Sequence, residues 1–195
     1  MNLLCDVSNF SKNNIVFLEM KKNIVIDGYF TKMIYSDSYL SLNGLYLYCP
    51  IEEYVETNLQ TNLMESVDEV DVVDLSQNSG VGLTNEYWIE RNKKNVAFSL
   101  ANIKNVQLMK ELSRIEHEII EYYKDFYKIN KLNVYSLRNQ MKTGNIKVLC
   151  KPSSQIHSIG DDTKNTPNTS NTFVLKISGI WETDSNIGIT YKFQK

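Results

Sequence analysis

The chain has 195 residues, of which 42% are hydrophobic and 23% are charged, so it can bury the core of one globular domain. Eight glycines, three prolines and the absence of an internal repeat exclude collagen-like, proline-rich and solenoid architectures. No apolar run approaches the roughly 20 residues of a membrane span, and the first residues do not resemble a secretory signal. The sequence therefore predicts an intracellular protein with no membrane partner.

Charge is distributed unevenly along the chain. Residues 1–90 contain 4 Lys and Arg against 14 Asp and Glu, whereas residues 91–195 contain 17 against 9. The formal net charge of −2 conceals this asymmetry. It favours an anionic partner for the basic part of the chain, and the alternative is two differently solvated faces of one domain.

The first third of the sequence is rich in β-forming residues. An apolar run at 15–18 and a β-branched and aromatic stretch at 23–35 predict strands, the second of which ends at the turn residues 36–38. Asn43 and Gly44 lie between two alternating runs, which predicts a two-residue hairpin turn. One long strand bulged at Gly44 is the alternative.

The next segment becomes acidic and then β-like again. Residues 51–79 alternate carboxylates with valines, which is compatible with an edge strand that has one charged face. The glycines of 79–82 predict a flexible joint rather than a phosphate loop, because no Gly-Lys-Ser/Thr follows them. Residues 87–89 and 96–100 predict two further strands.

The clearest predicted element is a helix from about Asn105 to Ile129. Apolar residues recur there at spacings of four and three, with charged residues on the opposite face. Asn105 is the predicted N-cap, and Asn130 is the residue expected to end the helix in a left-handed conformation. The predicted apolar face consists of Leu108, Leu112, Ile115, Ile119, Tyr122 and Phe126.

The C-terminal third predicts a return to strands. Residues 132–140 fit a strand or a short helix, and 146–150 fit a strand. Residues 152–172 are almost all polar and predict a mobile surface loop. Two alternating runs within 173–193, separated by the polar turn 183–186, predict a hairpin whose last strand belongs to the core sheet.

Catalytic and metal-binding signatures are weak. His117 has carboxylates nearby on the predicted helix, but the other histidine, His157, falls in the predicted loop. Three widely spaced cysteines supply neither a disulfide framework nor a zinc knuckle. We therefore expect no catalytic residues, no metal and no cofactor. A Mg²⁺-dependent nuclease is the enzymatic alternative, and it would need carboxylates that converge in a pocket.

Lysines and aromatic residues on the predicted strands are the candidates for nucleic-acid binding, because ammonium groups neutralise phosphates and aromatic rings stack on bases. Lys176 and Lys192 each lie opposite the large apolar residues of their strand, which favours phosphate contact. Trp181 shares its alternation with Leu175 and Ile177, so a core position is the favoured alternative for its ring. The predicted nucleic-acid-binding residues are Lys32, Tyr35, Tyr46, Lys176, Trp181 and Lys192.

Three patches of the sequence carry a resemblance to known proteins. Residues 26–36, 42–45 and 175–183 followed by 188–193 resemble a family of small proteins of nucleocytoplasmic large DNA viruses. The last patch, a strand, a Trp, a turn, a Gly and a strand, is also similar to the C-terminal hairpin of phage-type single-stranded DNA-binding proteins, which are OB folds. The long predicted helix in a strand-rich chain favours one α+β domain over 1–195. With the resemblance, the expected architecture is an OB-like and mainly antiparallel β-barrel with one long amphipathic helix.

The implied function is non-catalytic binding of single-stranded DNA in viral DNA replication, recombination or repair. The implied location is the host cytoplasm or nucleus, or the virion, and viral replication proteins and a second copy of the chain are further partners that the resemblance allows. Phage-type members carry an acidic C-terminal tail, whereas the acidic run here lies at 65–74, for which we hypothesise a role in competing with DNA. The alternative function, favoured by the sequence pI of about 5.8, is a virion or scaffold module that binds proteins and no nucleic acid.

Overall fold

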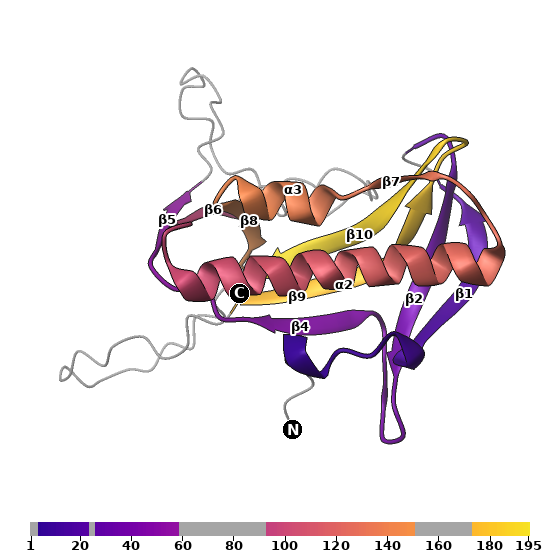
Figure 1. The fold of residues 1–195 in the computed structure, drawn as a ribbon, viewed down its shortest axis with the longest axis horizontal. Helices are drawn as coiled ribbons and strands as arrows, with labels where there is room; N and C mark the ends of the chain where they lie inside the picture. The colour runs from indigo at the N-terminus through magenta and orange to yellow at the C-terminus, as the bar shows by residue number, and fades with distance from the viewer. Residues whose placement is uncertain (1–3, 24–25, 59–92, 151–172) are drawn as a thin grey trace, which may run out of the picture.

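The computed structural model describes residues 4–23, 26–58, 93–150 and 173–195, and it is an α+β fold with two α-helices on one side of a ten-stranded, mostly antiparallel sheet (Figure 1). The predictions for the acidic run 65–74, the joint 79–82, the strand 87–89 and the loop 152–172 lie outside the described residues. The helices are α2 (Ile103–Tyr127) and α3 (Ser136–Lys142), preceded by two short 3₁₀ turns at Val7–Asn9 and Lys12–Asn14. The strands are β1 (Ile15–Lys22), β2 (Tyr29–Ser36), β3 (Ser41–Leu42), β4 (Leu45–Cys49), β5 (Tyr54–Asn58), β6 (Lys93–Phe98), β7 (Leu132–Val134), β8 (Asn145–Leu149), β9 (Phe173–Glu182) and β10 (Asn186–Gln194).

The predicted C-terminal hairpin is confirmed and forms the centre of the sheet. β9 and β10 pair antiparallel, and the sheet order is β1-β2-β9-β10-β8-β6-β5. On the side away from β10, β9 pairs with β2 at one end and with β4 at the other. On the side away from β9, β10 pairs in parallel with β7 and then with β8. Four strands, β2, β4, β7 and β8, are thus hydrogen-bonded directly to the hairpin.

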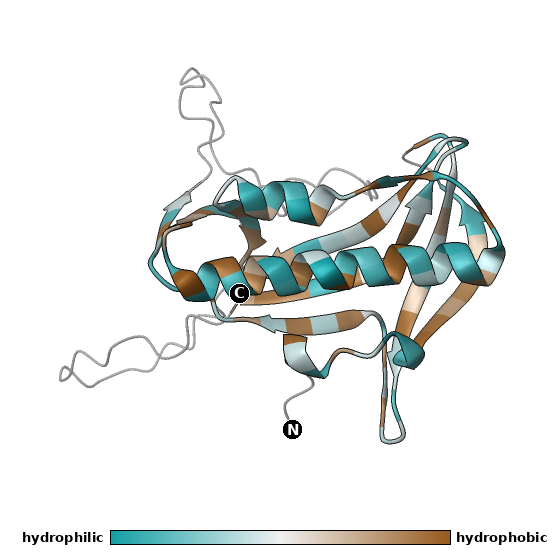
Figure 2. Cartoon of the chain, viewed as in Figure 1, coloured by the Kyte–Doolittle hydropathy of each residue, from teal (hydrophilic) through white to brown (hydrophobic). Residues whose placement is uncertain are grey.

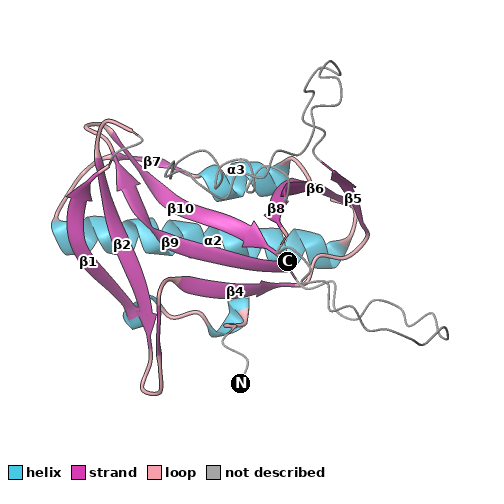
Figure 3. Cartoon of the chain, turned by 180° about the vertical axis from the view of Figure 1, so that it is seen from behind, coloured by secondary structure: helices cyan, strands magenta, loops and turns pink. Residues whose placement is uncertain are grey.

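The expected closed barrel is not observed. β1 and β5 end the sheet order, and within the described residues they do not pair with each other, so the sheet stays open. Figure 3 shows the sheet as a curved layer in front, with α2 running behind its strands. In a closed barrel, strand side chains alone would fill the interior. Here α2, a helix of 25 residues, packs against the sheet and completes the core instead.

The Asn43-Gly44 hairpin prediction is wrong, and so is its alternative of one bulged strand. β3 pairs with β2, whereas β4 pairs with β9, so Gly44 marks the point where the chain passes from one neighbour to another. Gly44 has a φ of +106°, and an added Cβ would lie 2.6 Å from the carbonyl oxygen of Ile177. The glycine is needed here for a close approach to β9 as well as for its backbone angle.

The long helix is confirmed, but its cap residues differ from the prediction. Asn102 is the N-cap, with its side chain accepting from the backbone N–H groups of Lys104 and Asn105, and Lys128 adopts the left-handed conformation at the C-cap with a φ of +56°. Asn105 is instead buried and bridges to another segment. Its amide donates to the carbonyl oxygens of Glu52 and Ser99 and accepts from the backbone N–H of Glu52.

The apolar face of α2 agrees with the prediction over the first four turns and then rotates. Leu108, Leu112, Ile115 and Ile119 are buried, whereas Phe126 is 59% exposed. The buried positions further along the helix are Ile120 and Tyr123. Figure 2 shows hydrophobic and hydrophilic segments that alternate along α2, as expected for a helix with one buried face.

α3 is fixed to α2 by a buried carboxylate. The two oxygens of Glu116 accept from the backbone N–H groups of Leu137 and Arg138, at 2.9 and 2.8 Å. These N–H groups belong to the first turn of α3, where a helix has no acceptors of its own. Burial raises the pKa of Glu116, and the two backbone hydrogen bonds oppose that rise.

Residues 132–140 contain both predicted alternatives, because the short strand β7 is followed directly by the helix α3.

Candidate nucleic-acid interface

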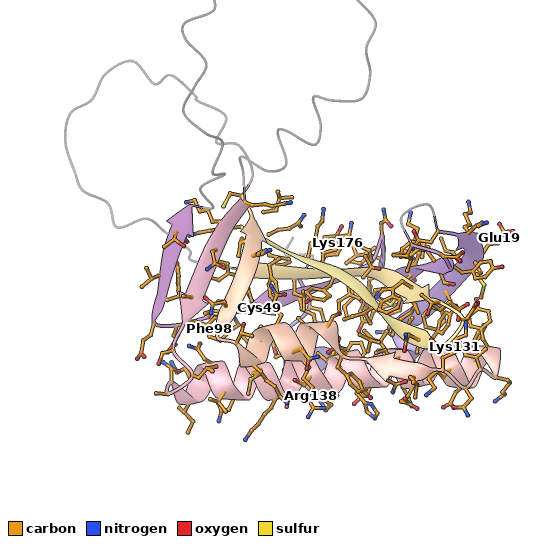
Figure 4. All side chains as sticks on the ribbon, turned by 90° about the horizontal axis from the view of Figure 1, so that it is seen from above. Glu19, Cys49, Phe98, Lys131, Arg138 and Lys176 are labelled. Atoms are coloured by element: carbon orange, nitrogen blue, oxygen red, sulfur yellow. The ribbon has the colours of Figure 1, made fainter. Side chains whose placement is uncertain are left out.

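The two sides of the sheet differ in what covers them. α2 and α3 pack on one side, which we call the inner face, and the other side, the outer face, has no helix of the described chain on it (Figures 3 and 4). Lys176 lies on the outer face in Figure 4, and Arg138 of α3 lies on the opposite side of the molecule. Strand alternation and register place on the outer face the side chains of Lys21, Phe30, Lys32, Tyr46, Tyr48, Lys93, Lys147, Lys176, Trp181 and Lys192.

A row of three predicted residues crosses the middle of the outer face. Tyr46 of β4 is the cross-strand neighbour of Lys176 of β9, which is in turn the neighbour of Lys192 of β10. The ammonium nitrogen of Lys176 lies 4.9 Å from the centroid of the Tyr46 ring, a cation–π contact. Two lysines directly opposite each other repel. The row therefore has the charge arrangement of a surface that an anion would stabilise.

Two aromatic rings lie beside this row, over glycines. Phe30 of β2 pairs with Trp181 of β9, and Trp181 pairs with Gly188 of β10. An added Cβ at Gly188 would lie 2.7 Å from the Trp181 ring, and one at Gly179 would lie 2.8 Å from the Phe30 ring. The glycines thus leave room for each ring to lie along the sheet, and the two rings line a surface hollow of about 850 Å³.

The position of Trp181 corrects the favoured expectation of a core ring. The ladder of β9 and β10 shifts register between Thr190 and Tyr191, which is a β-bulge. Before the bulge Leu175 and Ile177 are buried, and after it Ile180 is buried, so the alternation changes phase. Trp181 is therefore on the outer face although it follows Ile177 by an even number of residues.

Lys32 also lies on the outer face. It is exposed and stands beside Gly179 of β9. Lys32 lines a second hollow together with Lys21, Phe30 and Glu19. Glu19 is the one carboxylate among the described strand residues of the outer face, and it lies at the edge strand β1 (Figure 4).

Tyr35 was predicted to bind nucleic acid, but it does not lie on the outer face. It is 6% exposed and lies on the inner face, where its ring stacks on Phe10 at 6.3 Å between centroids. Its hydroxyl accepts from the backbone N–H of Ser11 at 3.1 Å. Tyr35 is a structural residue that ties the N-terminal segment to β2, and it cannot stack on a base.

Sequence reasoning missed five outer-face residues, of which one is Tyr48 of β4. Lys21 and Phe30 are cross-strand neighbours on β1 and β2, and Lys93 and Lys147 lie on β6 and β8. The alternation within 146–149, buried Ile146 and Val148 with exposed Lys147 between them, could have indicated Lys147. Lys93 could not have been assigned, because its neighbour Lys94 faces the other way and forms an ion pair with Glu56 at 3.1 Å.

The described residues do not assemble a metal site. No group of three or more His, Cys, Asp or Glu side chains converges within the part of the chain that the structure describes. His117 contacts the hydroxyl of Tyr135 through its Nδ1 at 2.9 Å, on the exposed side of α2. Neither described helix has the length and the apolar character needed to cross a membrane.

Comparisons with protein-family models, with curated proteins and with solved structures found no match for this chain. The outer face therefore has to be interpreted from its own chemistry. It joins lysines from β1, β2, β6, β8, β9 and β10 with aromatic rings from β2, β4 and β9.

Proposed function

We propose that the chain binds single-stranded DNA on the outer face of the sheet, without catalysis and without sequence readout. The observation that carries the proposal is the collection on one open face of lysines that form no ion pair with any described residue, with aromatic rings between them. Single-strand binding surfaces combine a basic groove for the backbone with rings on which bases stack. The proposal needs an open strand face and does not depend on the closed OB barrel.

The positions of the residues suggest a division of labour. Lys32, Lys176 and Lys192 are the phosphate contacts, since each ammonium group can donate to phosphate oxygens. Trp181 and Tyr46 are the stacking residues. Stacking by each ring would contribute about 1–3 kcal/mol per base and would tolerate any base, because every base has a π-face.

The test is fluorescence anisotropy of a labelled oligo-dT of about 30 nucleotides, titrated with the full chain at low and at physiological salt, with duplex of equal length as competitor. We expect binding that falls steeply with salt and favours the single strand. The triple variant Lys32/Lys176/Lys192→Ala should bind at least tenfold more weakly. Its salt slope should fall by about 2, because each phosphate contact on a single strand contributes about 0.7.

A matched control removes the same charge from the other side of the molecule. Lys110, Lys128 and Lys142 are exposed residues of α2, its C-cap and α3, and their triple alanine variant should bind oligo-dT like the parent chain. Equal losses in both triple variants would refute the outer face as the site. No binding at low salt would overturn the proposal and favour a protein-interaction module.

A further inference from the structure

A slot passes between strands at one end of the outer face. β10 pairs with β7 through residues 186–188 and with β8 through 193–194, and along residues 189–192 this edge of β10 pairs with no described strand. A pocket of about 450 Å³ opens there, within the range of about 300–1,000 Å³ that is usual for small-molecule sites. Its lining residues are Lys93, Gln140, Lys147, Val148, Leu149, Tyr191, Lys192 and Phe193.

The rim of the slot is cationic. Lys93, Lys147 and Lys192 come from β6, β8 and β10, and none of the three forms an ion pair with a described residue. No carboxylate is among the described lining residues. The adjacent lysines of the inner side, Lys94 and Lys195, both pair with Glu56. The three rim lysines thus surround one opening with their charges uncompensated, which is the arrangement that a phosphate group stabilises.

The floor of the slot offers an oriented amide. The Tyr191 hydroxyl donates to Gln140 Oε1 at 2.8 Å. Burial raises the pKa of Tyr191 to about 12, and the hydroxyl is protonated at neutral pH, as that of an ordinary tyrosine is. This hydrogen bond fixes the Gln140 amide with its oxygen engaged. Its Nε2 group has no hydrogen-bond partner among the described residues and can donate into the slot.

One end of the slot is apolar. Val148 and Phe193 are buried and are paired neighbours in the register of β8 and β10, so together they close the slot at the point where the two strands meet. A planar group in the slot would bury apolar surface against this end wall. The slot therefore offers three ammonium groups at its rim, one apolar end wall and one amide donor at its floor.

We propose that this slot binds one nucleotide, with its phosphate at Lys93, Lys147 and Lys192 and its base in the slot, where the Gln140 amide donates to an acceptor on the base edge. The inference rests on the proposed function, because it assigns to the bound strand one nucleotide that enters the sheet while its neighbours lie on the outer face. It adds Lys93, Lys147 and Gln140 to the binding residues.

The test is a titration of the full chain with dTMP, followed by the NMR signals of the glutamine side-chain amides, with thymidine and inorganic phosphate as separate probes. We expect saturable shifts of the Gln140 amide with dTMP, and binding at least fivefold weaker for thymidine and for phosphate, since each supplies only part of the contacts. Lys93/Lys147→Ala should weaken dTMP binding at least tenfold, whereas the control Lys110/Lys142→Ala on the helix side should leave it unchanged.

The results separate the slot from the outer face as a whole. Absence of shifts at Gln140, equal binding of phosphate and dTMP, or unchanged dTMP binding in Lys93/Lys147→Ala would each overturn the nucleotide slot. Oligo-dT binding that is lost in Lys32/Lys176/Lys192→Ala and unchanged in Lys93/Lys147→Ala would also overturn the slot and support the outer face. Binding of dTMP without binding of oligo-dT would support the slot and overturn the single-strand proposal.

Discussion

The inner and outer faces of the sheet are built by the same strands, yet charged groups have partners of opposite charge or polar partners on one side and lack them among the described residues on the other. On the inner side the described chain has two buried carboxylates. Glu116 of α2 accepts from the backbone of α3, and Glu182 of β9 forms an ion pair with Lys131 at 3.1 Å through an oxygen that accepts no hydrogen bond from a described group. On the outer face Lys176 and Lys192 stand opposite each other with no described carboxylate between them. Folding accounts for the inner face, because buried charges need partners.

The outer face is not explained by folding in the same way. Exposed strand lysines can protect a sheet edge, but Lys176 of β9 is paired on both sides, with Tyr46 of β4 and with Lys192 of β10. A cross-strand lysine pair in the middle of a sheet lowers stability slightly. The difference indicates that packing determines the residues of the inner face, whereas the residues of the outer face suit an anionic ligand.

The largest expected effect is on the inner face. Leu112 is fully buried between α2 and the sheet, and Leu112→Ala should lower the free energy of unfolding by about 3 kcal/mol, from lost transfer energy and the cavity left behind. Urea unfolding followed by circular dichroism measures it. Lys32→Ala on the outer face is the contrast, with an expected change below about 0.5 kcal/mol. Similar losses in the two variants would remove the distinction between the faces.

A smaller effect should separate a bridging asparagine from a capping one. Asn105→Ala removes three hydrogen bonds that join α2 to Glu52 and Ser99 and leaves backbone groups without partners, so we expect a loss of about 2 kcal/mol. Asn102→Ala removes the N-cap and should cost about 1 kcal/mol. If unfolding measurements gave the larger loss for Asn102→Ala, the bridging role of Asn105 would be wrong.

The smallest effect is a gain in stability on the outer face. Lys192→Thr removes the repulsion across from Lys176 and places a β-branched residue in a central strand, so the free energy of unfolding should rise by about 0.5 kcal/mol at low salt. The same variant should bind oligo-dT several-fold more weakly. Thermal unfolding and anisotropy on one preparation measure both. A variant that loses stability and keeps its affinity would contradict the interpretation of the outer face.

Local patterns predicted the elements that depend on nearby residues. The spacing of Leu108, Leu112 and Ile115 was sufficient for the long helix, because an amphipathic stripe needs only the helical period. The alternation on both sides of the turn at 183–186 was sufficient for the C-terminal hairpin. The exposure of Lys176 and Lys192 followed from the same alternation.

Long-range pairing decided what these patterns could not. Gly44 connects strands with different neighbours because β4 pairs with β9, which is distant in sequence. The bulge opposite Thr190 moved Trp181 to the outer face. Tyr35, by contrast, lies on the inner face through the regular alternation of β2, which it shares with Thr31 and Met33. A one-residue change of phase exchanges the two faces of a strand, and no local signal marks it.

By itself, the sequence determined the α+β class, the long helix, the central hairpin and the lysines that alternate with buried residues. Only the tertiary structure decided that the sheet remains open, that lysines from six strands share one face, and that β10 leaves a slot beside β8. The physical reason is that periodicity follows from the geometry of a single element, whereas the composition of a face depends on register between strands far apart in the chain.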